Sequence, residues 1–272
     1  TAALTPGAPL QKGALERVVL LHDTLPGIAA TARLRAGEQP GGTVVTVETR
    51  TEAKWAGELS ADNHGDRYTG RRQGGLRLEW NNPSGRGDQL GLRLQSAGAG
   101  RVYGRLGYDF ALHGPWRATA SASSTRYELG EEFRNLEADG RAETASLEVR
   151  YPLILRAALR LDAVAATDYL QMVDCIGLTA TERDKSLLDG RLGIALQAAD
   201  HWRGQSALSL QLTAGRLDIH DRDEQRFDAV SVGSEGGFSK LTLGGERWQQ
   251  LPGGFHLRAS ASLQWALDNL TS

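Results

Sequence analysis

The strongest constraint on the fold of this chain is a repeated alternation of apolar and polar residues. Within residues 74–80, Leu76 and Leu78 would point to one side of an extended strand. Arg77 and Glu79 would point to the other side. The same period of two returns almost to the end of the sequence, in segments of about ten residues. Such strands, with one apolar and one strongly polar face, are typical of an antiparallel transmembrane β-barrel.

Composition excludes two other classes of protein. No apolar run approaches the ~20 residues that a membrane-spanning helix requires, and only 40% of the 272 residues are hydrophobic. A barrel tolerates this composition because only alternate residues face lipid. The 31 basic and 33 acidic residues give a net charge of -2, and they form no block of one sign. The chain therefore lacks the basic footprint of a nucleic-acid-binding protein.

The sequence offers no recognisable catalytic or metal site. Cys175 is the only cysteine, which excludes an internal disulfide and a cysteine-based metal cage. The six histidines are scattered, without a pair at metal-ligand spacing. Acidic residues between 218 and 228 could in principle bind calcium, but their spacing matches no EF-hand pattern. We expect an exposed loop there, and no catalytic residue, metal or cofactor in the chain.

Residues 1–52 differ in kind from the rest of the chain. A helix is predicted over 12–23, followed by strands over 28–35 and 43–50. A helix packed on a hairpin of this size is small for independent stability, so we expect it to be part of a larger α+β domain. From residue 53 to residue 272 the pattern predicts about eleven strands. Their expected cores are 54–63, 70–81, 88–97, 101–112, 117–128, 141–152, 155–169, 185–198, 205–216, 236–249 and 254–267.

The connections between these strands are unequal in length. Tight turns are expected at 82–87, 113–115 and 251–254. Longer polar connections are expected at 131–139, around 171–184 and at 218–229. Outer-membrane barrels have short turns at the periplasmic rim and long loops outside the cell. The long connections should therefore face the exterior.

A set of short motifs gives the chain a family resemblance. Its residues are Leu25, Pro26, Gly27, Asp62, Asn63, Tyr68, Gly70, Asn82, Pro83, Gly85, Gly87 and Asp88. In this order and spacing they resemble the TpsB transporters of two-partner secretion, the haemolysin and filamentous-haemagglutinin secretion family of the BamA-like superfamily. The likeness covers nearly the whole chain, and residues 62–90 are its most specific part.

The resemblance implies a fold, a location and a function. Family members carry periplasmic POTRA domains before an outer-membrane barrel of ~16 strands. Residues 1–52 resemble the C-terminal part of a POTRA domain, and 53–272 resemble the first part of the barrel. The first POTRA domain, the plug helix, the loop with a Val-Arg-Gly-Tyr/Phe motif and the last strands have no counterpart here, so we expect a fragment. The implied function is translocation of an unfolded, secreted TpsA-type client polypeptide across outer-membrane lipid.

The polar face of the predicted strands carries charges of both signs. The residues expected to line the lumen are Arg77, Glu79, Arg93, Arg101, Arg105, Arg117, Glu148, Arg150, Arg160, Arg191 and Arg258. A wall of both signs stays hydrated and lets an unfolded polypeptide slide past. Aromatic residues near the strand ends are expected to form girdles in the headgroup zone. They are Trp55, Trp80, Trp116, Tyr151, Trp202, Trp248 and Trp265.

Three alternatives remain open from the sequence. The first is an assembly factor of the same superfamily that inserts other barrels. The second is an outer-membrane enzyme whose acid and base lie in the loops, where His113, His201 and His220 are available. The third is a soluble β-sandwich, in which the alternating leucines would be buried against a second sheet.

Overall fold

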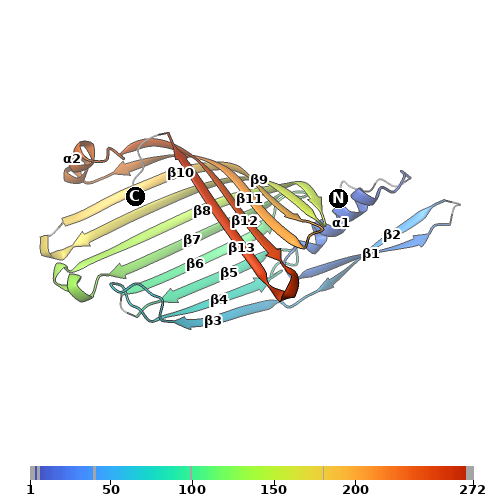
Figure 1. The fold of residues 1–272 in the computed structure, drawn as a ribbon, viewed down its shortest axis with the longest axis horizontal. Helices are drawn as coiled ribbons and strands as arrows, with labels where there is room; N and C mark the ends of the chain where they lie inside the picture. Colours follow the sequence, from blue (N-terminus) through green and yellow to red (C-terminus); the bar gives the residue numbers. More distant parts are fainter. Residues whose placement is uncertain (1–3, 5–6, 39–40, 99, 180, 268–272) are drawn as a thin grey trace.

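The chain folds into a small N-terminal unit and one large curved sheet (Figure 1). The structure is a computed structural model that describes residues 4, 7–38, 41–98, 100–179 and 181–267. The N-terminal unit consists of α1 (Lys12–Asp23), β1 (Ile28–Ala36) and β2 (Thr43–Thr51). The two strands pair antiparallel along their full length. The helix and both strands expected before residue 52 are therefore present.

The large sheet contains eleven antiparallel strands, each hydrogen-bonded to its neighbours in the sequence. They are β3 (Trp55–Asp62), β4 (Gln73–Asn81), β5 (Gln89–Ser96), β6 (Arg101–Ala111), β7 (Arg117–Glu128), β8 (Ala138–Arg156), β9 (Leu159–Ile176), β10 (Thr181–Ala199), β11 (Gly204–Ile219), β12 (Gly236–Gln250) and β13 (His256–Ala266). This consecutive order is a meander, the arrangement that hairpin connections impose. The predicted fold class, mainly β with one large antiparallel sheet, is confirmed.

Four consecutive strands, β8 to β11, are longer than the sequence pattern predicted. They contain 19, 18, 19 and 16 residues. The prediction of a long connection over 171–184 is wrong, because Ile176 still pairs with Thr181 and only a short 3-10 turn, Gly177–Thr179, separates β9 from β10. The prediction of a connection over 131–139 is also too long, since β8 begins at Ala138. Backbone hydrogen bonds between strands continue beyond the segments in which apolar and polar residues alternate. The alternation alone therefore does not locate the ends of these strands.

The two faces of the large sheet have opposite chemistry. On one face, apolar side chains are exposed; Leu188 is 57% and Leu192 is 64% exposed. On the other face, polar side chains take their place and some of them are buried; Asp162 and Thr213 are each 4% exposed. This distribution is the reverse of a soluble domain and matches a barrel with an apolar exterior. Among the described residues no second layer covers these leucines, which argues against the soluble β-sandwich.

The sheet curls so that β12 and β13 pass in front of the earlier strands in the view of Figure 1. Its order begins with β3 and ends with β13, so within the described residues each of these strands is paired on one side only. Unpaired backbone groups in lipid cost several kcal/mol each. We therefore expect these two edges to be covered in the assembled membrane protein.

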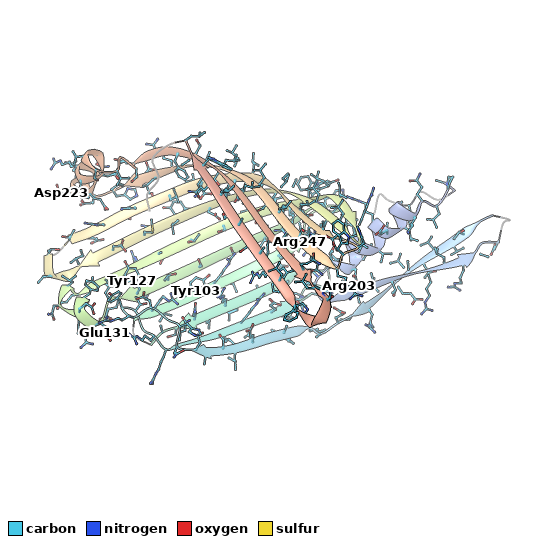
Figure 2. All side chains as sticks on the ribbon, in the orientation of Figure 1. Tyr103, Tyr127, Glu131, Arg203, Asp223 and Arg247 are labelled. Carbon is cyan, nitrogen blue, oxygen red and sulfur yellow. The ribbon has the colours of Figure 1, made fainter. Side chains whose placement is uncertain are left out.

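The two rims of the sheet differ in their connections. One rim carries the N-terminal unit and the shorter turns, including the 3-10 turn Pro252–Gly254 between β12 and β13 (Figure 1). The other rim carries the 3-10 helix η1 (Glu131–Leu136) and α2 (Arg222–Val230). Figure 2 shows Arg203 and Arg247 near the first rim, and Glu131 and Asp223 at the second. We call them the turn rim and the loop rim. No helix in the described part of the chain has the length and apolar character needed to cross a membrane.

The exposed apolar face yields a first testable prediction. Leu192→Arg should destabilise the folded protein in a bilayer by about 2–4 kcal/mol, because it places a charge on the lipid face. Gln211→Arg is the matched control, since Gln211 lies on the polar face opposite Gly193. Urea unfolding in lipid vesicles measures both changes. Equal losses in the two variants would contradict the assignment of the faces.

Candidate functional site

The polar face of the large sheet is the principal candidate site. Strand register fixes which side chains share it, because residues directly opposite one another point to the same side. Register and the alternation along each strand place one set of charged residues on this face. The set is Arg77, Glu79, Arg93, Arg101, Arg105, Arg117, Glu148, Arg150, Arg160, Arg191 and Arg258. These residues come from β4 to β10 and from β13, and we call the charged face that they form the wall.

Many of these arginines are neutralised by an acid on the same strand. Arg77 lies 2.5 Å from Glu79, and Arg150 lies 2.7 Å from Glu148. Arg160 bonds Asp162 at 2.7 Å in the same way. Each pair is two residues apart, the spacing at which side chains of one strand share a face.

Other pairs on this wall cross between strands. Arg117 bonds Asp109, and Arg258 lies 2.6 Å from Glu246. Exposed ion pairs add little to stability. Their main consequence is chemical, because a wall of internally paired charges stays wet without a strong net field.

One cluster of the motif residues lies at the turn rim, in the connection between β4 and β5. Asp88 is 1% exposed and accepts hydrogen bonds from the Tyr108 hydroxyl at 2.6 Å and from the Ser84 hydroxyl at 2.8 Å. Burial alone would raise the pKa of Asp88, but the hydrogen bonds from Tyr108 and Ser84 outweigh it and hold that pKa below the usual range. The Asn82 side chain accepts the Gly87 amide at 2.7 Å. Asp88 and Asn82 therefore fix the shape of this turn.

The segment Leu25-Pro26-Gly27 packs against that turn. A Cβ atom on Gly27 would lie 2.9 Å from the Asn81 Cβ, and one on Gly87 would lie 3.0 Å from the Leu25 Cβ. Both glycines also have positive φ, which other residues rarely adopt. These two positions therefore need glycine for the close approach and for the turn.

The N-terminal unit has a second attachment to the large sheet, through α1. Arg17 donates to the Pro152 carbonyl at 2.9 Å, and the Glu16 carboxylate accepts the Ala157 amide at 2.7 Å. The register of β8 shifts between Pro152 and Ile154, where proline cannot donate to the ladder. We call this contact, together with the packing of Leu25 and Gly27 on the β4–β5 turn, the rim joint.

The remaining motif residues lie at the loop rim. Asp62 accepts the His64 amide at 2.9 Å, and the Tyr68 carbonyl accepts the Gly130 amide at 2.7 Å. A Cβ on Gly70 would lie 2.4 Å from the Ala97 carbonyl oxygen. Asn63 lies in this same connection between β3 and β4, whereas Pro83 and Gly85 lie in the β4–β5 turn. The motif residues are thus divided between opposite rims, and at each rim they stabilise the connections between strands.

The connection between β11 and β12 is more ordered than the exposed loop predicted there. Asp221 caps α2 by accepting the amides of Asp223 and Glu224. Asp228 is 8% exposed and accepts the Ser234 hydroxyl at 2.7 Å. The spacing Asp221-x-x-Glu224, which resembles a capping box, could have revealed the helix from sequence. No cluster of three or more metal-binding side chains occurs in the described ranges.

The predicted aromatic girdles fit the register only in part. Trp55 stacks on Trp80 at 4.9 Å between ring centroids, and Trp116 contacts Tyr151 at 4.7 Å. Trp248 is an exception, because it lies opposite Arg258 on the polar face, with that guanidinium 5.0 Å from its ring centroid. A position near a strand end is therefore insufficient to predict a girdle residue. Whether the residue holds an odd or an even place along its strand decides which face it lies on.

The rim joint yields a second prediction. Gly87→Ala and Gly85→Ala should each cost about 1–2 kcal/mol of stability for the left-handed backbone, because the φ angles are 74° and 80°. Only Gly87→Ala should also displace Leu25, since nothing lies within 4 Å of a Cβ on Gly85. Hydrogen exchange of residues 25–28 should rise in Gly87→Ala alone. Equal exchange in both variants would show that Leu25 does not depend on this contact.

The Asp228 cluster yields a third prediction, on pH. Hydrogen bonds from the Ser234 hydroxyl and the Glu235 amide hold the pKa of Asp228 below its usual value. Its charge therefore stabilises the folded connection above the unfolded aspartate pKa of about 3.9, and this contribution is lost as pH falls through the lower folded value. Hydrogen-exchange protection of residues 220–235 should fall over that range. Asp228→Asn should reduce the pH dependence, and an unchanged dependence would refute the assignment.

Comparison with known proteins supports the architecture. Residues 41–272 match the family described as haemolysin secretion/activation protein ShlB/FhaC/HecB. The heme/hemopexin transporter protein HuxB of Haemophilus influenzae is 27% identical over 165 residues, which cover 60% of this chain and 29% of HuxB. The chain therefore spans under a third of that relative.

Two solved structures share the fold. CdiB from Escherichia coli superposes with a TM-score of 0.76 at 17% identity, over 92% of this chain and 47% of CdiB. CdiB from Acinetobacter baumannii gives a TM-score of 0.62 at 12% identity, over 90% of this chain and 45% of that one. The resemblance to TpsB transporters drawn from the motifs is confirmed, and the family match covers well over half of the sequence. This chain belongs to the haemolysin secretion/activation protein family ShlB/FhaC/HecB.

Proposed function

We propose that this chain is part of an outer-membrane transporter that translocates an unfolded secreted partner protein of haemolysin or adhesin type. Residues 53–272 would form the first part of the barrel. Residues 1–52 would be the C-terminal part of a POTRA domain on the periplasmic side. The observation that carries the proposal is the wall of charges of both signs, which lies on a sheet whose opposite face is apolar and exposed.

The chemistry of the wall suits passage of an unfolded polypeptide. Pairs such as Arg150 with Glu148 and Arg160 with Asp162 present both signs within a few ångströms. A passing chain then meets hydrated charges that already have partners, so it forms no strong, lasting contact. Passage of this kind needs no nucleotide. Folding of the exported chain outside the cell would supply the free energy.

The rim joint supports the assignment of the N-terminal unit to the periplasmic side. It places α1 at the turn rim, and short turns mark the periplasmic rim of outer-membrane barrels. At that position a POTRA edge could capture an extended client strand by main-chain pairing. HuxB is itself a transporter by name, which favours transport over the assembly of other barrels.

A fourth prediction tests the proposal through the rim joint. The double variant Glu16→Ala/Arg17→Ala removes both hydrogen bonds from α1 to the large sheet, at about 1 kcal/mol each. Export of the partner protein should fall while the barrel still inserts into the outer membrane. Arg33→Ala is the control, because the Arg33–Glu48 pair lies within the hairpin and is exposed.

The readout is the amount of partner protein in the medium and in the periplasm. The proposal requires the partner to be stranded in the periplasm when the gene is deleted. Loss of many unrelated outer-membrane barrels in the deletion strain would instead identify an assembly factor. Normal export together with normal levels of other outer-membrane barrels in the deletion strain would refute both functions for this chain.

A further inference from the structure

Three arginines form a row across neighbouring strands on the polar face. Arg77 in β4 lies directly opposite Arg93 in β5, and Arg93 lies directly opposite Arg105 in β6. With about 4.8 Å between strands, the row is roughly 10 Å long. Like charges placed directly opposite one another destabilise a sheet. Arg117 and Arg150 also lie directly opposite one another on this face, but each of them is bonded to an acid.

The surrounding acids neutralise only one end of the row. Arg77 is bonded to Glu79 and lies opposite Glu58 in β3. Neither Arg93 nor Arg105 takes part in the ion pairs formed by the described residues, although Arg105 donates to the Ser121 hydroxyl at 3.1 Å. Two neighbouring guanidinium groups consequently remain without a carboxylate.

Two other charged residues near the row, Asp109 and Arg101, are bonded elsewhere. Asp109 is bonded to Arg117 and also accepts the Thr119 hydroxyl at 3.0 Å. Arg101 donates to the Gln73 side chain at 3.1 Å. The contacts of Asp109 leave its carboxylate unavailable to balance the row.

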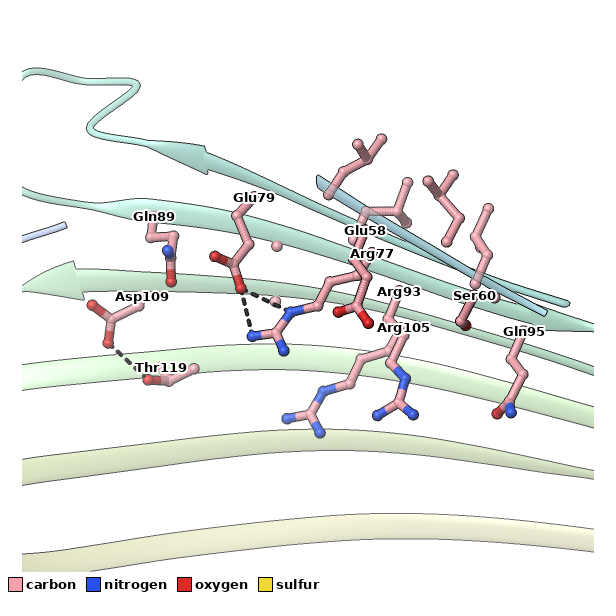
Figure 3. A pocket seen from close by; sticks show the side chains of 17 residues that line it. Glu58, Ser60, Arg77, Glu79, Gln89, Arg93, Gln95, Arg105, Asp109 and Thr119 are labelled. Atoms are coloured by element: carbon pink, nitrogen blue, oxygen red, sulfur yellow. Dashed lines mark hydrogen bonds and ion pairs between the residues drawn. The ribbon is translucent and has the colours of Figure 1, made fainter. Parts of the chain in front are cut away.

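The row borders a hollow in the wall. A cavity of about 500 Å³ is lined by all three arginines and by glycines of the same face. Gly91 and Gly107 lie directly opposite each other, beside Arg93 and Arg105. A Cβ on Gly91 would have nothing within 4 Å. Figure 3 shows Arg93 and Arg105 extending from the wall, with Arg77 turned to Glu79. The hollow therefore offers room for a ligand next to the two unneutralised guanidinium groups.

We propose that Arg93 and Arg105, with Arg77 beside them, bind carboxylate side chains of an acidic polypeptide segment. A guanidinium group donates two parallel hydrogen bonds to a carboxylate, which makes this pairing both strong and directional. Bound carboxylates would also relieve the repulsion between the arginines. That the segment belongs to a polypeptide in transit rests on the proposed function.

The dimensions of the row suit an extended peptide. Side chains at alternate positions of an extended chain share one side and lie about 7 Å apart. A peptide with acids at alternate positions can therefore direct two carboxylates toward a row of about 10 Å. The glycines leave space for its backbone. Elsewhere on the wall, pairs such as Arg160 with Asp162 are closed to a ligand, so the row would be a local retention point.

The test measures peptide binding to the full-length protein in detergent. The probe is a fluorescein-labelled peptide of alternating glutamate and serine, compared with one of alternating glutamine and serine. We expect the glutamate peptide to bind more tightly, and its Kd to rise at least about tenfold in Arg93→Gln/Arg105→Gln. Added salt should weaken the binding, because exposed charges are screened.

The chain provides a matched control. Arg126 and Arg141 are also directly opposite and exposed, but they lie on the other face of the sheet. Arg126→Gln/Arg141→Gln should leave the affinity for the glutamate peptide unchanged. Stability gives a second readout: Arg93→Gln/Arg105→Gln should unfold at the same or a higher urea concentration, because it removes repulsion. Destabilisation would assign these arginines a structural role instead.

The proposal is overturned if the glutamate peptide binds wild type and Arg93→Gln/Arg105→Gln equally, or no better than the glutamine peptide. Export of the partner protein is measured separately. Tight peptide binding without export would refute the proposed function and leave the carboxylate site standing. Normal export without peptide binding would refute the carboxylate site alone.

Discussion

Backbone hydrogen bonding is the constraint on which the rest of this structure depends. In lipid no water is available to satisfy an exposed amide or carbonyl, so the strands must satisfy one another. The eleven-strand meander does this for every strand between β4 and β12. Once the ladder is formed, consecutive side chains must alternate between the two faces. The apolar exterior and the charged wall are thus two consequences of one ladder.

The ladder also determines how charge is distributed on the wall. An acid two residues from an arginine on the same strand shares its face, and Arg150 with Glu148 is one such pair. Pairing of this kind involves one strand only, and it neutralises an arginine wherever the sequence places an acidic residue two positions away. Beside Arg93 and Arg105 the strands carry glycine instead, at Gly91 and Gly107. Where the sequence supplies glycine in place of that acid, the arginines stay unneutralised and a hollow is left beside them.

Local pattern was sufficient to predict the strands but not their full extent. The alternation around Leu76 and Arg77 predicts that this segment is a strand and which side chains share a face, because a period of two can be recognised within a few residues. The ladder from Ile176 to Thr181 was missed, since over residues 170–176 apolar and polar side chains occur on both faces and the alternation carries no contrast. The motif residues were found from their order, and their division between two rims follows from the meander, in which successive connections lie at opposite ends of a strand. The attachment of α1 was not predictable in this way, because it depends on contacts such as Arg17 with Pro152, 135 positions apart.

The rim joint shows how a small unit can be oriented by a large one. A surface helix held only by hydrophobic contact could slide or rotate, but Arg17 and Glu16 bond backbone groups at fixed places, the Pro152 carbonyl and the Ala157 amide. The irregularity at Pro152 disturbs the ladder, which leaves a carbonyl available to a partner outside the sheet. Close packing at Gly27 and Gly87 fixes a second point. Two separated points restrict rotation far more than one, so the direction in which α1 faces the barrel mouth is set by the barrel itself.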